Sequence, residues 1–462
     1  MAKLCIICGE SAKSGEHLFP AAFGGRRTNR GIYCGRHNNE FGRHVSALLE
    51  GLDIVNAIMG VIPDRKDEVR PALAIGEDGQ RFLVTGLEVK VAPPPPISET
   101  PELLGESVKM VFDNEEQIHK WIAAQESAGY RISHGSIGSP QTRILTSPLV
   151  AQRNLGDEPF MRGLLYLALT FLAHSYPSLA RSDALAAARE IVDKDGAVGD
   201  RVLWEPSICM EGITANPFEH GHTVCVGPVS GANKVGALIS LYGSIQFSID
   251  LGDADDGARV DRVATHVDPF ADNAGDSVVV IVDSGYLALS GPDASRAYLN
   301  RLRSGEVDNP LSPVLRSASD DELLSASEAF LNQLGIFQTM RSAQLSYRVM
   351  KLLAEHDQRI FSALHRGISD FAEATPDLPA AIHAALKQFV SADKGAPRGI
   401  SQHGEAALHV AKALLADEIL ARLQAGALDV NGVAGLLSGI EGQEIMLRFF
   451  GNLVLDALPK NL

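Results

Sequence analysis

Apolar residues recur at helical spacing in a stretch that begins at about Asn38. They return every three or four positions up to Val55, and the pattern ends near Gly60 to Pro63. This spacing places the side chains on one face, so it predicts an amphipathic helix. The residues that carry the periodicity are Phe41, Val45, Leu48, Leu49, Leu52 and Val55.

Further helical patterns occupy 147–195 and most of the chain from about Asp320 onward. The nearly apolar run from Gly163 to Ala173 is shorter than the roughly 20 residues of a membrane span, so it predicts a buried helix. The residues around Asn114 favour a helix cap, with the helix ending near Ser127. In the C-terminal region, Ala, Leu and Glu predict helices at 321–335, 340–364, 405–424 and 430–457.

Short β-type patterns predict strands in two regions. Around the turn signal at residues 77–80, the stretch 71–92 alternates between apolar and polar positions. Between 200 and 290, strands are predicted at 224–226, 237–241, 245–251 and 278–282, with a hairpin about Gly243. A strand is also predicted at 108–112, after Pro93 to Pro96, which must run extended. The predicted fold class is therefore multidomain α+β.

Two pairs of metal-ligand residues stand near the N-terminus. Cys5 and Cys8 are separated by two residues, as are Cys34 and His37. A two-residue spacer lets both side chains of a pair reach one tetrahedral ion, and three Cys with one His form a common structural zinc site. We therefore expect Zn²⁺ at these four residues, which would fold a module too small to bury a core.

The residues between the two pairs resemble the zinc-containing ββα branch of the HNH endonucleases. In that family, an acidic residue precedes a His, and an Asn lies five residues before the first ligand of the second pair. Glu16, His17 and Asn29 fill these positions, and Asn38 directly follows the second pair. The resemblance covers residues 1–45. The chain departs from the pattern by having His37 in place of a Cys and Asn38 in place of a His.

The resemblance implies a ββα, treble-clef-like finger and a set of catalytic roles. His17 would be the general base that activates water, and Asn29 would orient the His17 ring. Glu16 and Asn38 would bind one catalytic ion, Mg²⁺ or Mn²⁺, which prefers oxygen ligands. The expected activity is hydrolysis of phosphodiester bonds in DNA. Enzymes of bacterial anti-phage defence and of mobile elements are suggested by the same resemblance.

Charge is distributed unevenly between the finger and the rest of the chain. The net charge of all 462 residues is −16, but residues 1–44 hold seven basic and three acidic side chains, a net charge of +4. A basic module of this kind favours contact with nucleic-acid phosphates. The candidate phosphate-binding residues are Arg26, Arg27, Arg30, Arg36 and Arg43. The alternative for each is a solvated charged surface.

Three domains are predicted: residues 1–60, called the finger below, an α+β domain of unknown role at 61–310, and a helical domain at 311–462. The absence of a signal-like or membrane-spanning pattern, together with the five Cys, favours a cytoplasmic protein with no membrane partner. The apolar helix at 430–457 must be buried nearly all round, either in its own core or in a homodimer, and we expect the homodimer.

Two alternatives accompany this interpretation. The finger can instead be a non-catalytic module that binds nucleic acid or protein, although such a module has no need of Glu16, His17 and Asn29. A second metal site at Cys209, His220, His222 and Cys225, with Glu219 nearby, is the weaker possibility, because its spacing matches no regular zinc motif.

Overall fold

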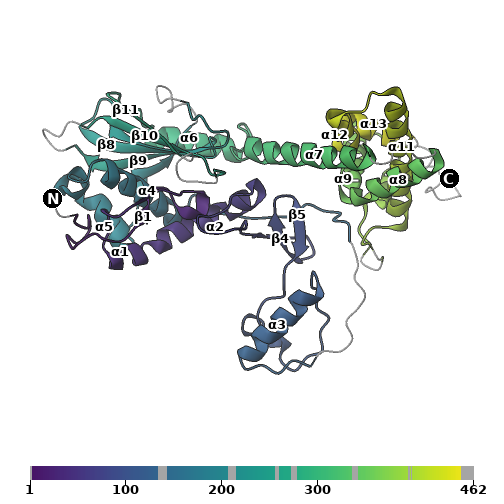
Figure 1. Ribbon diagram of the computed structural model, residues 1–462, viewed down its shortest axis with the longest axis horizontal. Coiled ribbons are helices and arrows are strands. Elements are labelled where there is room, and N and C mark those ends of the chain that lie inside the picture. Colours follow the sequence, from purple (N-terminus) through teal and green to yellow (C-terminus); the bar gives the residue numbers. More distant parts are fainter. Residues whose placement is uncertain are drawn as a thin grey trace. The chain divides into compact units, whose positions relative to one another are not determined.

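The structure of the protein is a computed structural model that describes residues 3–448 except 134–142, 207–214, 255–259, 272–277, 336–341, 394–395 and 397. The chain forms two compact units (Figure 1). Unit 1 comprises Met1–Ala74, Phe82–Lys90 and Ala151–Ala318, and unit 2 comprises Ile75–Arg81, Val91–Val150 and Ser319–Leu462. The fold is mixed α+β with a helical C-terminal region, as predicted.

A six-stranded antiparallel sheet forms the centre of unit 1. Its strand order is β11-β10-β7-β8-β9-β6. The β8–β9 connection is the predicted hairpin, in which Tyr242 and Gly243 have φ angles of 54° and 68°, as a type I′ turn requires. The strands are β6 Val202–Trp204, β7 His222–Pro228, β8 Lys234–Leu241, β9 Ile245–Asp253, β10 Arg262–Val267 and β11 Val278–Asp283.

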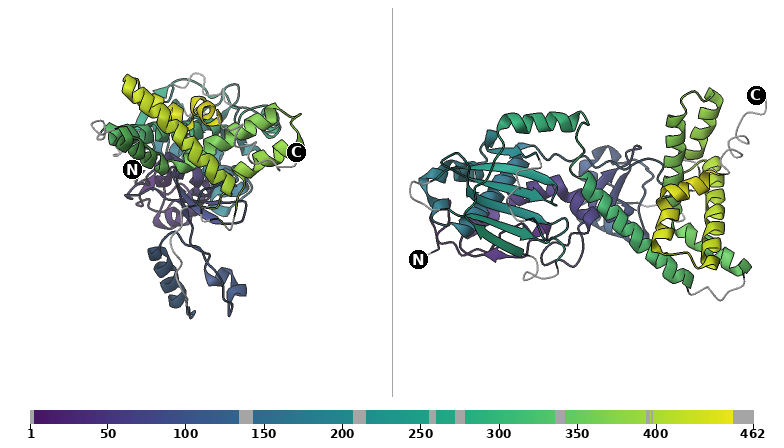
Figure 2. Two further views of the ribbon diagram at one scale, coloured as in Figure 1. Left: turned by 90° about the vertical axis from the view of Figure 1, so that its right-hand side faces the viewer. Right: turned by 90° about the horizontal axis from the view of Figure 1, so that it is seen from above.

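Helix α4 (Glu158–Ser175) lies between this sheet and helix α2 (Gly42–Met59), as Figures 1 and 2 show. It contains the apolar run that predicted a buried helix, and its residues from Gly163 to Ala173 are all buried. The two helices approach closely because each presents a glycine. A Cβ on Gly51 would lie 2.7 Å from the Phe160 ring, and one on Gly163 would lie 2.8 Å from the backbone oxygen of His44.

The finger contains β1 (Glu16–His17), the 3₁₀-helix η1 (Ala21–Phe23), β2 (Thr28–Asn29), α1 (Gly35–Glu40) and α2. It does not have a core of its own. Its buried residues belong to one continuous core with α4 and the six-stranded sheet. For example, the Phe19 ring stacks on His222 of β7 at a centroid distance of 4.7 Å. The finger therefore shares its hydrophobic core with residues beyond residue 60.

A three-stranded sheet, β3 (Ala72–Ile75), β4 (Arg81–Thr85) and β5 (Glu88–Val91), forms around the predicted turn. Helix α3 (Glu115–Ser127) follows, capped by Asn114 as predicted. The proline stretch runs along α3, where Trp121 Nε1 donates to the Pro94 carbonyl at 2.9 Å. The strand predicted at 108–112 was wrong, because these residues form no β-ladder in the structure.

Unit 2 has a second core, built from helices of the C-terminal region. Apolar residues of α12 and α13 are buried in this core, so the alternative of an internal core accounts for the described part of the 430–457 pattern. Residues 449–457 of that pattern lie outside the described residues. The helices are α7 Ser312–Gly335, α8 Ser342–Glu355, α9 Asp357–Ala374, α10 Ala380–Val390, α11 Gln402–Ala425, α12 Val430–Ser438 and α13 Ile440–Leu447.

None of the helices in the described part of the chain combines the length and the hydropathy needed to cross a bilayer.

The contact between α2 and α4 predicts an unusual response to alanine. Replacing a helical glycine by alanine normally favours the helix by up to about 1 kcal/mol. Gly163→Ala should instead lower the melting temperature, because overpacking costs roughly 1–3 kcal/mol and a backbone atom must move. Gly42→Ala is the matched control, since a Cβ there meets nothing within 4 Å. Thermal unfolding measures both, and equal melting temperatures would contradict the close contact.

Candidate functional site

The four predicted zinc ligands come together at the N-terminal end of the finger. Their ligand atoms all lie within 4.8 Å of one another. The sulfurs of Cys8 and Cys34 are 3.8 Å apart, and His37 Nδ1 lies 3.4 Å from Cys5 Sγ and 3.3 Å from Cys34 Sγ. Two sulfurs on a tetrahedral zinc, each about 2.3 Å from the ion, are about 3.8 Å apart. The cluster can therefore hold a zinc ion.

Local backbone structure explains how the two pairs meet. The first pair lies in a tight turn, closed by a hydrogen bond from the Gly9 amide to the Cys5 carbonyl at 3.0 Å. Gly9 has a φ of +73°, a conformation that side chains disfavour. Cys34 precedes the first turn of α1, which places His37 one turn further along the same helix.

A carboxylate from outside the finger supports the cluster. Asp193 of α5 (Ala186–Lys194) lies with its Oδ1 3.3 Å from His37 Nε2, the ring nitrogen that faces away from the sulfurs. A carboxylate in this position fixes the ring orientation of a zinc-binding His.

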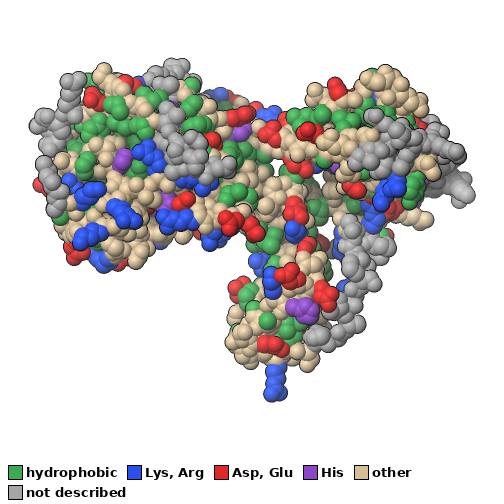
Figure 3. Space-filling model, viewed as in Figure 1, with side chains coloured by type: hydrophobic (Ala, Val, Ile, Leu, Met, Phe, Trp, Pro, Cys, Tyr) green, Lys and Arg blue, Asp and Glu red, His purple; other side chains and the backbone are tan. Residues whose placement is uncertain are grey.

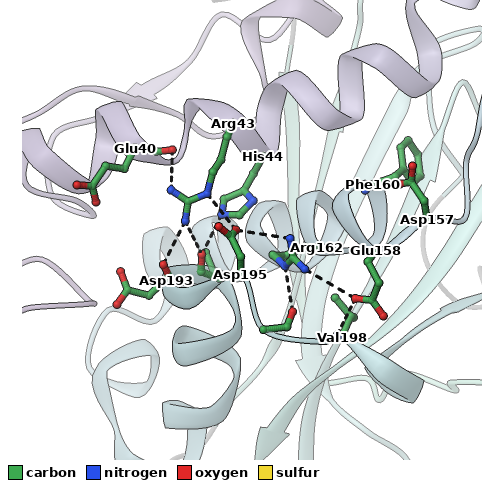
Figure 4. Close-up of polar contacts among 12 residues, drawn as sticks. Glu40, Arg43, His44, Asp157, Glu158, Phe160, Arg162, Asp193, Asp195 and Val198 are labelled. Carbon is green, nitrogen blue, oxygen red and sulfur yellow. Dashed lines mark hydrogen bonds and ion pairs between the residues drawn. The ribbon is translucent and has the colours of Figure 1, made fainter.

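Three side chains hold the C-terminal end of α5 in place (Figure 4). Arg43 donates to the Val192 and Asp193 carbonyls and to the Asp195 carboxylate, and His44 Nε2 donates to the Val192 carbonyl at 2.9 Å. Arg162 of α4 donates to the Gly196 carbonyl. Burial lowers the pKa of His44 to about 4, so the ring is neutral near pH 7. These three side chains donate hydrogen bonds to backbone carbonyls that have no partner within the helix, as is common at a helix C-terminus.

The register of the hairpin separates the predicted catalytic residues. Glu16 pairs with Asn29, and His17 pairs with Thr28. Cross-strand partners share a face, and neighbouring residues alternate. Glu16 and Asn29 therefore project to the inner face of the hairpin, and His17 projects to the outer face.

On the outer face, His17 has a carboxylate partner that the sequence did not indicate. His17 Nε2 lies 3.0 Å from Asp64 Oδ2, and the side chains are 21% and 17% exposed. The Asp64 carboxylate is also 3.7 Å from Arg26 and 3.5 Å from Arg65. The His–carboxylate pair is accessible to solvent, which a general base requires.

On the inner face, Asn29 has a different partner from the predicted one. Its amide nitrogen lies 2.8 Å from Nδ1 of His174, near the end of α4. Asn29 does not orient the His17 ring as expected, because the two side chains lie on opposite faces of the hairpin. Asp64 occupies the position next to His17 instead.

Glu16 is buried and hydrogen-bonded. Tyr166 of α4 donates its hydroxyl to Glu16 Oε1 at 2.6 Å. Burial raises the pKa of the Glu16 carboxyl, although the Tyr166 hydrogen bond and the neighbouring His17 act in the opposite direction. Asn38 Oδ1 is buried and has no hydrogen-bond partner among the described residues. Glu16 projects to the face of the hairpin opposite His17, so an ion held by Glu16 and Asn38 would not share the site of the predicted base.

The five predicted phosphate-binding arginines differ in how far they are already engaged. Arg26 donates to the Ala271 carbonyl at 2.6 Å, and Arg43 is committed to α5. Arg36 lies 3.6 Å from Glu40. Arg27 and Arg30 are exposed. Figure 3 shows several basic side chains on the part of unit 1 where the finger lies.

The second metal site is not supported by the described residues. Cys209 lies outside them. His222 and Cys225 are three positions apart in β7, so they lie on opposite faces of the sheet. His222 is enclosed by Phe19, Phe23 and Tyr242, and burial lowers its pKa to about 3. Among the described residues, the Cys5 cluster is the one group of metal-ligand side chains close enough to share an ion.

Comparisons with known proteins do not assign the chain to a family. No protein-family model matches it, no curated protein matches it, and no solved structure matches it.

The carboxylate behind His37 predicts how firmly the finger retains zinc. Cys34→Ser should abolish zinc binding, and Asp193→Asn should weaken it roughly 10–100-fold, because the ring loses its orienting partner. Elemental analysis after competition with a chelator measures the retention. Asp195→Asn is the control, since its carboxylate contacts Arg43 and Arg162. Wild-type zinc retention in Asp193→Asn would show that the contact does not support the site.

Proposed function

We propose that the protein is a metal-dependent endonuclease of the HNH type, acting on DNA through a treble-clef-like zinc finger. The observation that carries the proposal is the 3.0 Å contact between His17 and Asp64, on a hairpin built beside a Cys₃His cluster. A finger that only binds a partner has no need of an accessible His–carboxylate pair next to exposed arginines.

His17 would act as the general base. If its Nε2–H donates to Asp64, the lone pair of the neutral ring is on Nδ1. That nitrogen would take a proton from water as the water oxygen attacks phosphorus and the bond to the leaving oxygen breaks. The leaving oxygen then takes a proton from solvent. Asp64 would be a positioning residue that fixes the tautomer and stabilises the protonated ring.

The divalent ion, Mg²⁺ or Mn²⁺, would be held on the His17 face together with the scissile phosphate, and not by the predicted pair Glu16 and Asn38, because Glu16 projects to the other face of the hairpin. When bound, the ion supplies stabilisation of negative charge on the phosphate and the leaving oxygen. The hydrogen bond from Tyr166 fixes the Glu16 side chain in one orientation. Arg27 and Arg30 would bind backbone phosphates, which gives affinity without sequence specificity.

His17→Ala should lower cleavage of supercoiled plasmid by roughly 10²–10⁴-fold, the usual contribution of a general base. Asp64→Asn should lower it at least about tenfold, because the ring loses the partner that orients it. Cleavage is measured after removal of metal with EDTA and addition of Mg²⁺ or Mn²⁺, with zinc content checked in each variant.

Arg65→Ala is the control for Asp64, because Arg65 touches the same carboxylate but its side chain is 80% exposed. This variant should cut at nearly the wild-type rate. A His17→Ala protein that retains zinc and cuts like wild type would exclude His17 as the base. Plasmid binding without cleavage by the wild type would favour a non-catalytic zinc module.

The arginines predict a difference in salt dependence. The double variant Arg27→Ala and Arg30→Ala should bind DNA more weakly and reduce the slope of log affinity against log salt by about 2, since each phosphate contact contributes about one unit. Arg43→Ala should keep the slope and lower the melting temperature, because its guanidinium holds α5. An unchanged slope in the double variant would assign the phosphate contacts to other residues.

A further inference from the structure

A cavity of about 330 Å³ lies in unit 1 between the inner face of the finger hairpin and the sheet. Leu18, Phe19 and Arg27 line it from the hairpin, Phe171 and His174 from α4, and Thr265 from β10. Val280 and Val282 of the edge strand β11 complete the wall, and they are 49% and 62% exposed. Figure 3 shows exposed hydrophobic side chains over the strands of this sheet.

The walls of the cavity are apolar and partly aromatic. Pockets that bind small molecules are mainly apolar, contain a few oriented polar groups and begin at about 300 Å³. The valines of β10 and β11 offer an apolar surface against which a flat ligand can pack, and the largely buried rings of Phe19 and Phe171 also belong to the lining. This lining suits a planar, weakly polar group better than a sugar or a free ion.

The lining of the cavity includes one residue with a defined hydrogen-bond donor, His174. The Asn29 amide nitrogen can only donate, so His174 Nδ1 accepts and the ring proton is on Nε2. Burial, with Arg27 nearby, lowers the pKa of His174, so the ring stays neutral. Since His174 lines the cavity, its Nε2–H is the donor there that suits a carbonyl or ring nitrogen of a ligand.

A positive charge is available at the same cavity. Arg27 is exposed, and Leu18, which donates its amide to the Arg27 carbonyl at 2.9 Å, fixes the backbone there. A guanidinium is well matched to a phosphate group. The combination of stacking surfaces, an N–H donor and a guanidinium corresponds to the parts of a nucleotide.

We propose that this cavity binds one nucleotide, with the base against Phe171 and the valines and the phosphate at Arg27. The inference rests on the proposed function, because the cavity shares the hairpin with His17. Leu18 directly follows His17, and Arg26, which also lines the cavity, is 3.7 Å from the Asp64 carboxylate. The nucleotide comes either from an unpaired position of a nucleic-acid strand, as in enzymes that hold a base outside the stack, or from a free mononucleotide.

The test is equilibrium binding to the full-length His17→Ala protein. The probes are the nucleoside 5′-monophosphates, a fluorescent single-stranded oligonucleotide, and the same oligonucleotide with abasic positions. Arg27→Ala should weaken mononucleotide binding at least tenfold, and Lys13→Ala, which removes an exposed charge of the same finger outside the cavity, should change it less than twofold. Val280→Trp, which fills the cavity from an exposed position, should abolish binding with little change in melting temperature.

Tighter binding of the intact oligonucleotide than of the abasic one assigns the nucleotide to a strand. Binding of the monophosphates with no difference between the two oligonucleotides assigns it to a free ligand. Failure of every monophosphate to bind at millimolar concentration, or full binding by a folded Val280→Trp protein, overturns the proposal. Plasmid cleavage by the wild type is measured separately. Nucleotide binding without cleavage would contradict the proposed nuclease function and support the proposed nucleotide site.

Discussion

The burial of α4 on all sides is the constraint on which unit 1 depends. A helix that is apolar all round is stable only inside a protein, so it needs covering elements on every side. The sheet covers one side, and α2 with the finger covers the other. The hydrogen bonds from Tyr166 to Glu16 and between Tyr33 and Thr170 join the finger to this helix. The rest of unit 1 therefore helps to set the geometry of the finger.

Strand alternation then divides the hairpin into two chemical environments. The outer face carries His17 beside Asp64, where water has access. The inner face carries Asn29 and Leu18 against α4 and the cavity. Arg26 belongs to both, because it lines the cavity and lies near the Asp64 carboxylate. A ligand on the inner face would thus be linked to the His17 environment through one short strand and one guanidinium.

Local patterns in the sequence predicted local structure well. The two-residue spacers indicated the Cys₃His cluster, and Gly243 indicated the β8–β9 hairpin, because both depend on residues close in the chain. The partners that complete the site could not be predicted in this way. Asp64 is 47 residues from His17, and His174 is 145 residues from Asn29. Asp193 belongs to a helix whose only sequence signal is amphipathicity. Such pairs depend on packing, which residue spacing does not encode.

Packing also reduces the number of basic side chains on the finger that are available to bind phosphate. Its net charge of +4 over residues 1–44 includes Arg43 and Arg26. Arg43 is hydrogen-bonded at the end of α5, and Arg26 contacts the Ala271 carbonyl and the Asp64 carboxylate. Arg36 shares its charge with Glu40. Exposed charges are screened within about 10 Å at moderate salt, so Arg27 and Arg30 can act on a phosphate only at close range. With a net charge of −16 on the whole chain, long-range attraction of a duplex is weak. Recognition of the proposed nucleic-acid substrate would then come from contacts at the hairpin itself.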